Sequence, residues 1–141
     1  MEIKEILLVD GKTPITSAIG FILQSRGYLV TLAPDAETAT AELDNCGFNL
    51  MLVYLSGHEK DKLALLQQAK QRSPQTKIMV VGNPRVLPLP LDVFQTEMDD
   101  YLLTPFTAPE LCHRVDRCLQ KLSTNHMKVR PKRSIRKCSN H

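Results

Sequence analysis

Few side chains in this sequence are both reactive and placed where chemistry could occur. Asp10, Tyr54 and Thr104 each end or follow an apolar run, and they supply a carboxylate, a phenol and a hydroxyl. A lone carboxylate holds Mg²⁺ only weakly, because this ion needs several hard oxygen ligands. A phenol with a pKa of about 10 stays protonated at neutral pH and is a poor nucleophile. Since the sequence contains no glycine-rich phosphate loop, metal-ligand cluster or catalytic triad, we expect no enzyme, no cofactor, and Asp10 as at most a weak Mg²⁺ site.

These residues must be positioned by strands and helices that alternate along the chain. Short, continuous apolar runs are typical of strands covered on both faces, and they occur at residues 6–9, 28–32, 50–54, 78–81 and 101–103. The spacing of apolar residues and the capping residues predict helices between them, at 14–26, 35–46, 60–72 and 107–122. Pro88 and Pro90 exclude a long helix around residue 90 but allow a short one over 91–97.

Two of the predicted helices have clear start signals. Thr13 followed by Pro14 is a capping residue with proline at the first helical position, and Gly27 is the expected stop of that helix. Thr107 and Glu110 have the spacing of a capping box, in which each side chain accepts from the other's backbone N–H. These signals predict the residues at which the first and last helices begin.

Strands that alternate with helices imply an α/β fold: a doubly wound, five-stranded parallel sheet with helices on both faces. In such sheets the functional crevice lies at the carboxyl ends of the strands. The polar or small residues that follow the strands should therefore meet there: Asp10, Gly11, Tyr54, Ser56, Gly82, Asn83 and Thr104.

Charge is unevenly distributed along the 141 residues, of which 43% are hydrophobic and 23% charged. Residues 123–141 contain no acid and six basic residues: Lys128, Arg130, Lys132, Arg133, Arg136 and Lys137. The whole chain carries +3, so the remainder is mildly acidic. We expect one globular domain over 1–122 and a basic, flexible C-terminal tail over 123–141. This tail is either a solubilising end or an electrostatic contact for nucleic acid.

No apolar run reaches the roughly 18–20 residues needed to cross a bilayer, so no membrane contact is expected. The first five residues lack the basic-then-apolar order of a signal peptide. Cys46, Cys112, Cys118 and Cys138 form no CxxC pair. A cytoplasmic protein with reduced cysteines is the expectation from these features.

Four blocks of the sequence occur in order and with near-normal spacing, at residues 6–10, 27–30, 48–53 and 99–106. Together they resemble the receiver domain of two-component response regulators. The resemblance extends over about 3–122. It implies a flavodoxin-like sheet with the strand order 2-1-3-4-5. It also implies a cis peptide bond between Thr104 and Pro105.

Receiver domains transfer a phosphoryl group from a kinase histidine to their own aspartate. Carried over by position, the resemblance keeps Asp10 as the first of two acids, while Gly11 replaces the second, a direct Mg²⁺ ligand. Tyr54 stands at the phosphoacceptor, Gly82 at the hydroxyl residue, and Thr104 at the phosphate-binding lysine. The resemblance therefore implies a pseudo-receiver, which keeps the fold and loses the phosphotransfer chemistry.

Three of these positions allow two interpretations each. Asp10 is either a remnant metal ligand or a residue that caps a loop or helix. Tyr54 either fills the emptied acidic pocket with its ring or is a partly buried aromatic at a strand end. Tyr101 stands at the family's aromatic switch position, and without a hydroxyl at Gly82 we expect it to be fixed rather than switching.

The leading functional hypothesis is a receiver-like signalling module of a two-component phosphorelay. It would act by protein–protein contact with a histidine kinase, another regulator or itself. The expected partner face is formed by Leu87, Leu89, Leu91 and Tyr101. The alternative is a nucleic-acid-associated regulator that uses the basic tail for weak, non-specific contact.

Overall fold

The computed structural model of the chain describes residues 3–10, 13–55, 60–83, 85 and 98–120. Strands and helices alternate through them: β1 (Glu5–Val9), α1 (Pro14–Ser25), β2 (Leu29–Ala33), α2 (Ala36–Asn45), β3 (Leu50–Leu55), α3 (Lys60–Arg72), β4 (Lys77–Gly82), β5 (Asp100–Leu103) and α5 (Ala108–Gln120). These elements confirm the pattern predicted from the sequence, with small differences at their ends. The short helix predicted over 91–97 lies outside the described residues.

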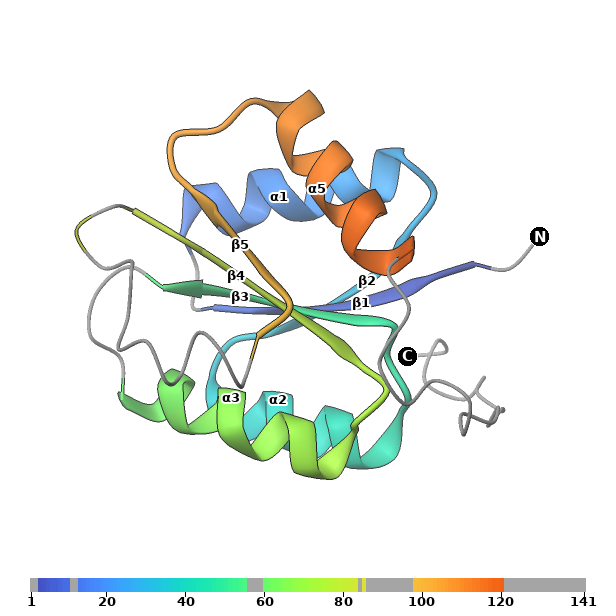
Figure 1. The fold of residues 1–141 in the computed structure, drawn as a ribbon, viewed down its shortest axis with the longest axis vertical. Helices are drawn as coiled ribbons and strands as arrows, with labels where there is room; N and C mark the ends of the chain where they lie inside the picture. Colours follow the sequence, from blue (N-terminus) through green and yellow to red (C-terminus); the bar gives the residue numbers. More distant parts are fainter. Residues whose placement is uncertain (1–2, 11–12, 56–59, 84, 86–97, 121–141) are drawn as a thin grey trace.

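The five strands form one parallel sheet in the order β2-β1-β3-β4-β5. This confirms the doubly wound, flavodoxin-like topology. Helices α1 and α5 cover one face of the sheet, and α2 and α3 cover the other (Figure 1). Because all strands run the same way, their carboxyl ends meet at one edge of the sheet.

Two hydrophobic clusters fill the space between the sheet and the helices. In β1, Leu7 and Val9 belong to the cluster under α2 and α3, while Ile6 and Leu8 belong to the cluster under α1 and α5. All four are fully buried. Successive side chains of a strand point to opposite faces, so a strand covered on both faces needs an unbroken apolar run. This is the physical reason for the continuous runs in the sequence.

The predicted helix starts are confirmed. Thr13 caps α1, where its hydroxyl accepts from the backbone N–H of Thr16, and Pro14 follows it. In the capping box of α5, the Glu110 N–H donates to Thr107 Oγ1 at 3.1 Å, and the Thr107 N–H donates to Glu110 Oε1 at 3.4 Å. After α1, Gly27 adopts a φ of 97°, a left-handed conformation that favours glycine.

The cysteines follow the expectation only in part. Cys112 and Cys118 form no disulfide and are buried, as expected for reduced, structural residues. Cys46, at the end of α2, is disulfide-bonded, so the expectation of a reduced thiol is wrong for this residue. Cysteine spacing along the chain cannot reveal such a bond, because two sulfurs far apart in sequence can meet in the fold. The peptide bond between Thr104 and Pro105 is cis, as the resemblance implied.

The helices in the described part of the chain are too short, or too polar, to cross a bilayer. The basic tail of 123–141 lies outside the described residues.

Candidate functional site

The sheet edge where the strands end brings together Asp10, Tyr54, Gly82 and Thr104. Asp10 follows β1, and its backbone N–H donates to the carbonyl of Ala33 at 2.9 Å, which extends the pairing with β2. Tyr54 lies beside Val81 in the register of β3 and β4. The Thr104 N–H donates to the carbonyl of Gly82 at 2.8 Å. Gly11, the remaining predicted pocket residue, lies outside the described residues.

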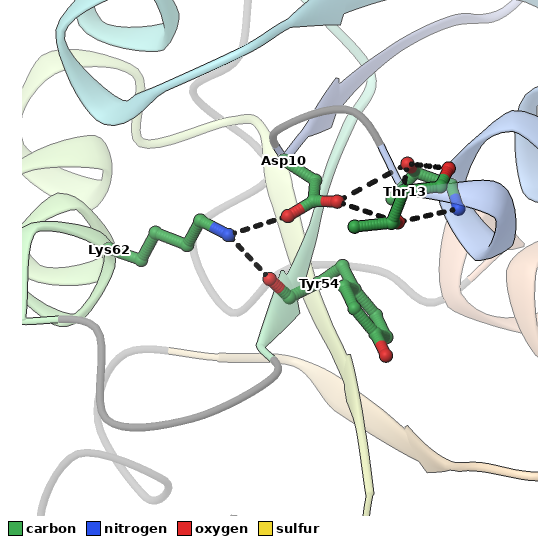
Figure 2. A network of polar contacts seen from close by, with 5 residues as sticks. Asp10, Thr13, Tyr54 and Lys62 are labelled. Carbon is green, nitrogen blue, oxygen red and sulfur yellow. Dashed lines mark hydrogen bonds and ion pairs between the residues drawn. The ribbon is translucent and has the colours of Figure 1, made fainter.

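A lysine that the sequence interpretation did not single out occupies the centre of this edge. Lys62, in the first turn of α3, extends its side chain toward Asp10, which follows β1 (Figure 2). Its Nζ donates to Asp10 Oδ1 at 2.8 Å and to the backbone carbonyl of Tyr54 at 2.9 Å. The two charged side chains are 10% and 4% exposed, so this is a buried ion pair.

The other carboxylate oxygen of Asp10 binds the start of α1. Asp10 Oδ2 accepts from the hydroxyl of Thr13 at 3.0 Å and from the hydroxyl of Thr16 at 3.2 Å. Asp10 thus has hydrogen-bond donors on both oxygens, which offsets the cost of burying its charge. Its carboxylate connects three elements: β1, the capped start of α1, and α3.

The geometry of this site does not fit a Mg²⁺ ion. Mg²⁺ prefers near-octahedral coordination by hard oxygens, commonly with carboxylates among them. Here the buried carboxylate faces an ammonium group, and a divalent cation beside Lys62 Nζ would meet strong charge repulsion. In the ranges that the structure describes, no three His, Cys, Asp or Glu residues come close enough to hold a metal ion. The ammonium group lies between a carboxylate and a strand-end carbonyl, and both are typical oxygen ligands of a cation.

Tyr54 contributes its backbone rather than its ring to the polar network. Figure 2 shows the phenol ring turned away from both Asp10 and Lys62. The partly buried ring packs against the hydrophobic cluster under α1 and α5. This arrangement matches the interpretation of Tyr54 as an aromatic at a strand end, and the side chain that lies against the Asp10 carboxylate is Lys62.

Tyr101, at the predicted switch position, lies in the edge strand β5 and is 41% exposed. Its backbone carbonyl accepts from Arg114 of α5 at 2.7 Å. Arg114 also forms a bidentate ion pair with Asp100: its Nη2 donates to Oδ1 at 2.8 Å, and its Nε donates to Oδ2 at 3.2 Å. Hydrogen bonding to Asp100 raises the pKa of the Arg114 guanidinium above its ordinary value. The backbone of β5 is therefore fixed to α5 by a permanently charged group.

Leu87, Leu89 and Leu91, the other members of the predicted partner face, lie outside the described residues. The same is true of all six basic residues of the tail.

The sequence carried one signal for Lys62 that the interpretation did not use. A lone carboxylate at the end of a buried strand needs a partner, because an unpaired buried charge is costly. Lys62 precedes Leu63 and Leu66 on the predicted helix over 60–72, close to the boundary of its apolar side. A lysine at such a boundary can bury its stem and direct its charge either to solvent or to a partner.

Comparison with known proteins supports the assignment of the fold. A family model described as "Response regulator receiver domain" matches residues 6–116. Among curated proteins, the chain is 32% identical over 121 residues to the transcriptional regulatory protein CpxR of Klebsiella pneumoniae, covering 83% of this chain and 50% of that protein. Across the first curated relatives, the chain spans between 24% and 52% of their lengths.

Solved structures show the same architecture. A CheY-like response regulator receiver domain protein from Methanospirillum hungatei superposes with a TM-score of 0.75 at 27% identity, covering 84% of this chain and 94% of that one. The receiver domain of a sensor histidine kinase from Pseudomonas aeruginosa superposes with a TM-score of 0.74 at 23% identity, covering 85% of this chain and 100% of that one. That structure has a magnesium ion coordinated in its active site cleft.

Proposed function

The chain belongs to the response regulator receiver domain family, and from this premise we propose that it is a receiver that does not accept a phosphoryl group and signals by protein–protein contact. Receiver domains work in two-component signalling, where they interact with histidine kinases or other regulators. The observation that supports the proposal is the buried pair between Lys62 and Asp10. It places an ammonium group of the chain itself against the one acid that remains at the site.

Phosphoryl transfer to this site lacks a nucleophile. An acceptor must attack phosphorus with an ionised oxygen, and family members use a carboxylate at the position of Tyr54. The phenol of Tyr54 is turned away from the polar network, and both oxygens of Asp10 already accept hydrogen bonds. The described part of the site provides no general base that could activate a phenol.

The same pair supports a single fixed conformation. Lys62 connects α3 to the ends of β1 and β3 without an added ion or phosphate. A ligand shifts a conformational equilibrium only if it binds one state better than the other. Because this site has its cation built in, Mg²⁺ and phosphoryl mimics have no vacant position from which to act.

Phosphorylation is tested by incubating the full chain with acetyl phosphate and Mg²⁺ and measuring its intact mass. We expect no gain of a phosphoryl group. The variant Tyr54→Asp should also remain unlabelled, because Lys62 still neutralises the site and Gly11 and Thr104 still replace the second acid and the lysine. A combined variant with Gly11→Asp, Tyr54→Asp, Lys62→Gly and Thr104→Lys restores the second acid, the acceptor and the lysine, removes the ammonium group of Lys62, and serves as the positive control.

Labelling of the unmodified chain would contradict the proposal. Efficient labelling of the single variant Tyr54→Asp would show that Lys62 does not block the site. In both cases, the modified residue identified by peptide mapping would show which side chain accepts the phosphoryl group.

A further inference from the structure

Helices α2 and α3 lie side by side on one face of the sheet (Figure 1), with an open surface groove between them. The groove has a volume of about 480 Å³. Polar side chains of both helices contribute to its lining, among them Glu37, Thr40 and Asp44 of α2 and Gln68 of α3. We call this surface the α2–α3 face. It lies on the opposite side of the sheet from α1 and α5.

The α2–α3 face carries negative charge that its own residues balance only in part. Helix α2 contains Glu37, Glu42 and Asp44 and no basic residue. Arg72 of α3 pairs with Asp44 at 2.7 Å. Within the described ranges, neither Glu37 nor Glu42 takes part in an ion pair. A basic segment would therefore find complementary charge along α2.

A covalent bond at the end of α2 indicates which segment this is. Cys46, the C-terminal capping residue of α2, is disulfide-bonded. The chain contains three other cysteines, and two of them, Cys112 and Cys118, form no disulfide. The cysteine that remains is Cys138, which lies outside the described residues, within the basic tail of 123–141.

We propose that the basic tail of residues 123–141 docks on the α2–α3 face of its own chain, and that a disulfide between Cys46 and Cys138 holds it there. The tail brings six basic residues and no acid to a helix that has acids and no base. This inference goes beyond the proposed function and uses no residue of the polar network at Asp10.

The chain is long enough for this contact. Helix α5 ends at Gln120, at the edge of the sheet where the strands begin (Figure 1). Cys46 lies between the end of α2 and the start of β3, and therefore at the same edge. The stretch from 121 to 138 spans up to about 60 Å when extended. A domain of this size is only about 35 Å across, so the tail can reach Cys46 by a curved path.

The bond forms by thiol–disulfide exchange. The two thiols of the chain and one molecule of oxidised glutathione give the protein disulfide and two molecules of reduced glutathione, so two electrons and two protons pass to the small disulfide. The equilibrium constant of this reaction is the effective concentration of one protein thiol at the other. A flexible tether alone gives a value in the millimolar range, and docking of the tail raises it.

The first test identifies the bond. The full chain is treated with oxidised glutathione, alkylated under denaturing conditions and digested without reduction. We expect mass spectrometry to find the peptides of Cys46 and Cys138 joined within a monomeric chain, with Cys112 and Cys118 alkylated. A Cys46 that carries only glutathione, or that joins a second chain, would overturn the proposal.

The second test separates docking from a loose tether. The effective concentration is measured in the full chain by titration with reduced and oxidised glutathione at low salt. Glu37→Gln should lower it about 1.5- to 5-fold, as expected for loss of an exposed ion pair. Salt at about 0.5 M should remove the difference between this variant and the unmodified chain.

Glu110→Gln is the matched control. It removes the same charge from α5, on the other face of the sheet, and its amide oxygen can still accept from the Thr107 N–H in the capping box. Its effective concentration should equal that of the unmodified chain. Equal values for Glu37→Gln, Glu110→Gln and the unmodified chain at low salt would overturn the docking site. The phosphorylation test is unaffected by either result, so the two proposals fail separately.

Discussion

At the scale of single residues, the lysine in the first turn of α3 is expected to have a large effect on stability. Removing one partner of a buried ion pair leaves the other charge uncompensated, which typically costs about 3–5 kcal/mol. Lys62→Met keeps the apolar stem and removes the charge, so it should lower the free energy of unfolding by about that amount. Urea denaturation with two spectroscopic probes measures it.

Lys70→Met is the control for this prediction. Lys70 pairs with Asp99 at 3.1 Å, but its side chain is 28% exposed, so its removal should cost only about 0–1 kcal/mol. The double variant of Asp10→Asn with Lys62→Met should be more stable than Lys62→Met alone, because it leaves no unpaired charge. Equal losses for Lys62→Met and Lys70→Met would contradict the assignment of a structural ion pair.

At the scale of elements, a tyrosine connects the start of β2 to the last helix. The hydroxyl of Tyr28 donates to Asp116 Oδ1 of α5, and its ring packs against the cluster under α1 and α5. Burial, followed by the hydrogen bond to Asp116, raises the pKa of this phenol above its ordinary value of 10.0. The folded protein therefore holds the proton at pH values where the unfolded chain releases it.

The sign of the pH dependence follows from this difference. The stabilisation from the protonated phenol is complete below pH 10 and is lost as the pH rises above it. We expect the free energy of unfolding to begin to fall near pH 10 and to keep falling at higher pH, and Tyr28→Phe to show a smaller fall. Asp116→Asn should reduce the fall only in part, since burial is the larger cause. Identical slopes for Tyr28→Phe and the unmodified chain would contradict the prediction.

The elements themselves could be predicted from the sequence because local rules decide them. The unbroken apolar runs of β1, β3 and β4 indicate strands covered on both faces, and the capping box at Thr107 fixes the start of α5. The end of each strand then places Asp10, Tyr54 and Gly82 at one edge. Lys62 could not be assigned in this way, because the spacing of apolar residues does not say where a long, flexible side chain directs its charge.

At the scale of the whole molecule, charge divides the chain into a mildly acidic domain and a strongly basic end. Six basic residues without an opposing acid should give weak, sequence-independent binding to DNA or heparin that falls steeply with salt. Deleting residues 123–141 should abolish this binding and, with all thiols kept reduced, leave thermal unfolding nearly unchanged, because the core clusters are made by residues up to Leu119. Salt-titrated fluorescence anisotropy with DNA measures the first effect, and melting followed by circular dichroism measures the second.

Two results would change this view of the tail. Unchanged DNA binding by the shortened chain would place the contact on the domain instead. Selective binding of one DNA sequence by the full chain would favour the alternative function, a regulator that acts on nucleic acid.

The ion pair of Lys62 and Asp10 also bears on how such a molecule conveys information. A cation that belongs to the polypeptide is present once in every copy and cannot be chelated or exchanged. On the proposal above, the domain cannot report the state of a kinase through its own modification. What varies in the cell is then the number of copies of the domain. On this proposal, the signal depends on how much of the chain is synthesised and degraded.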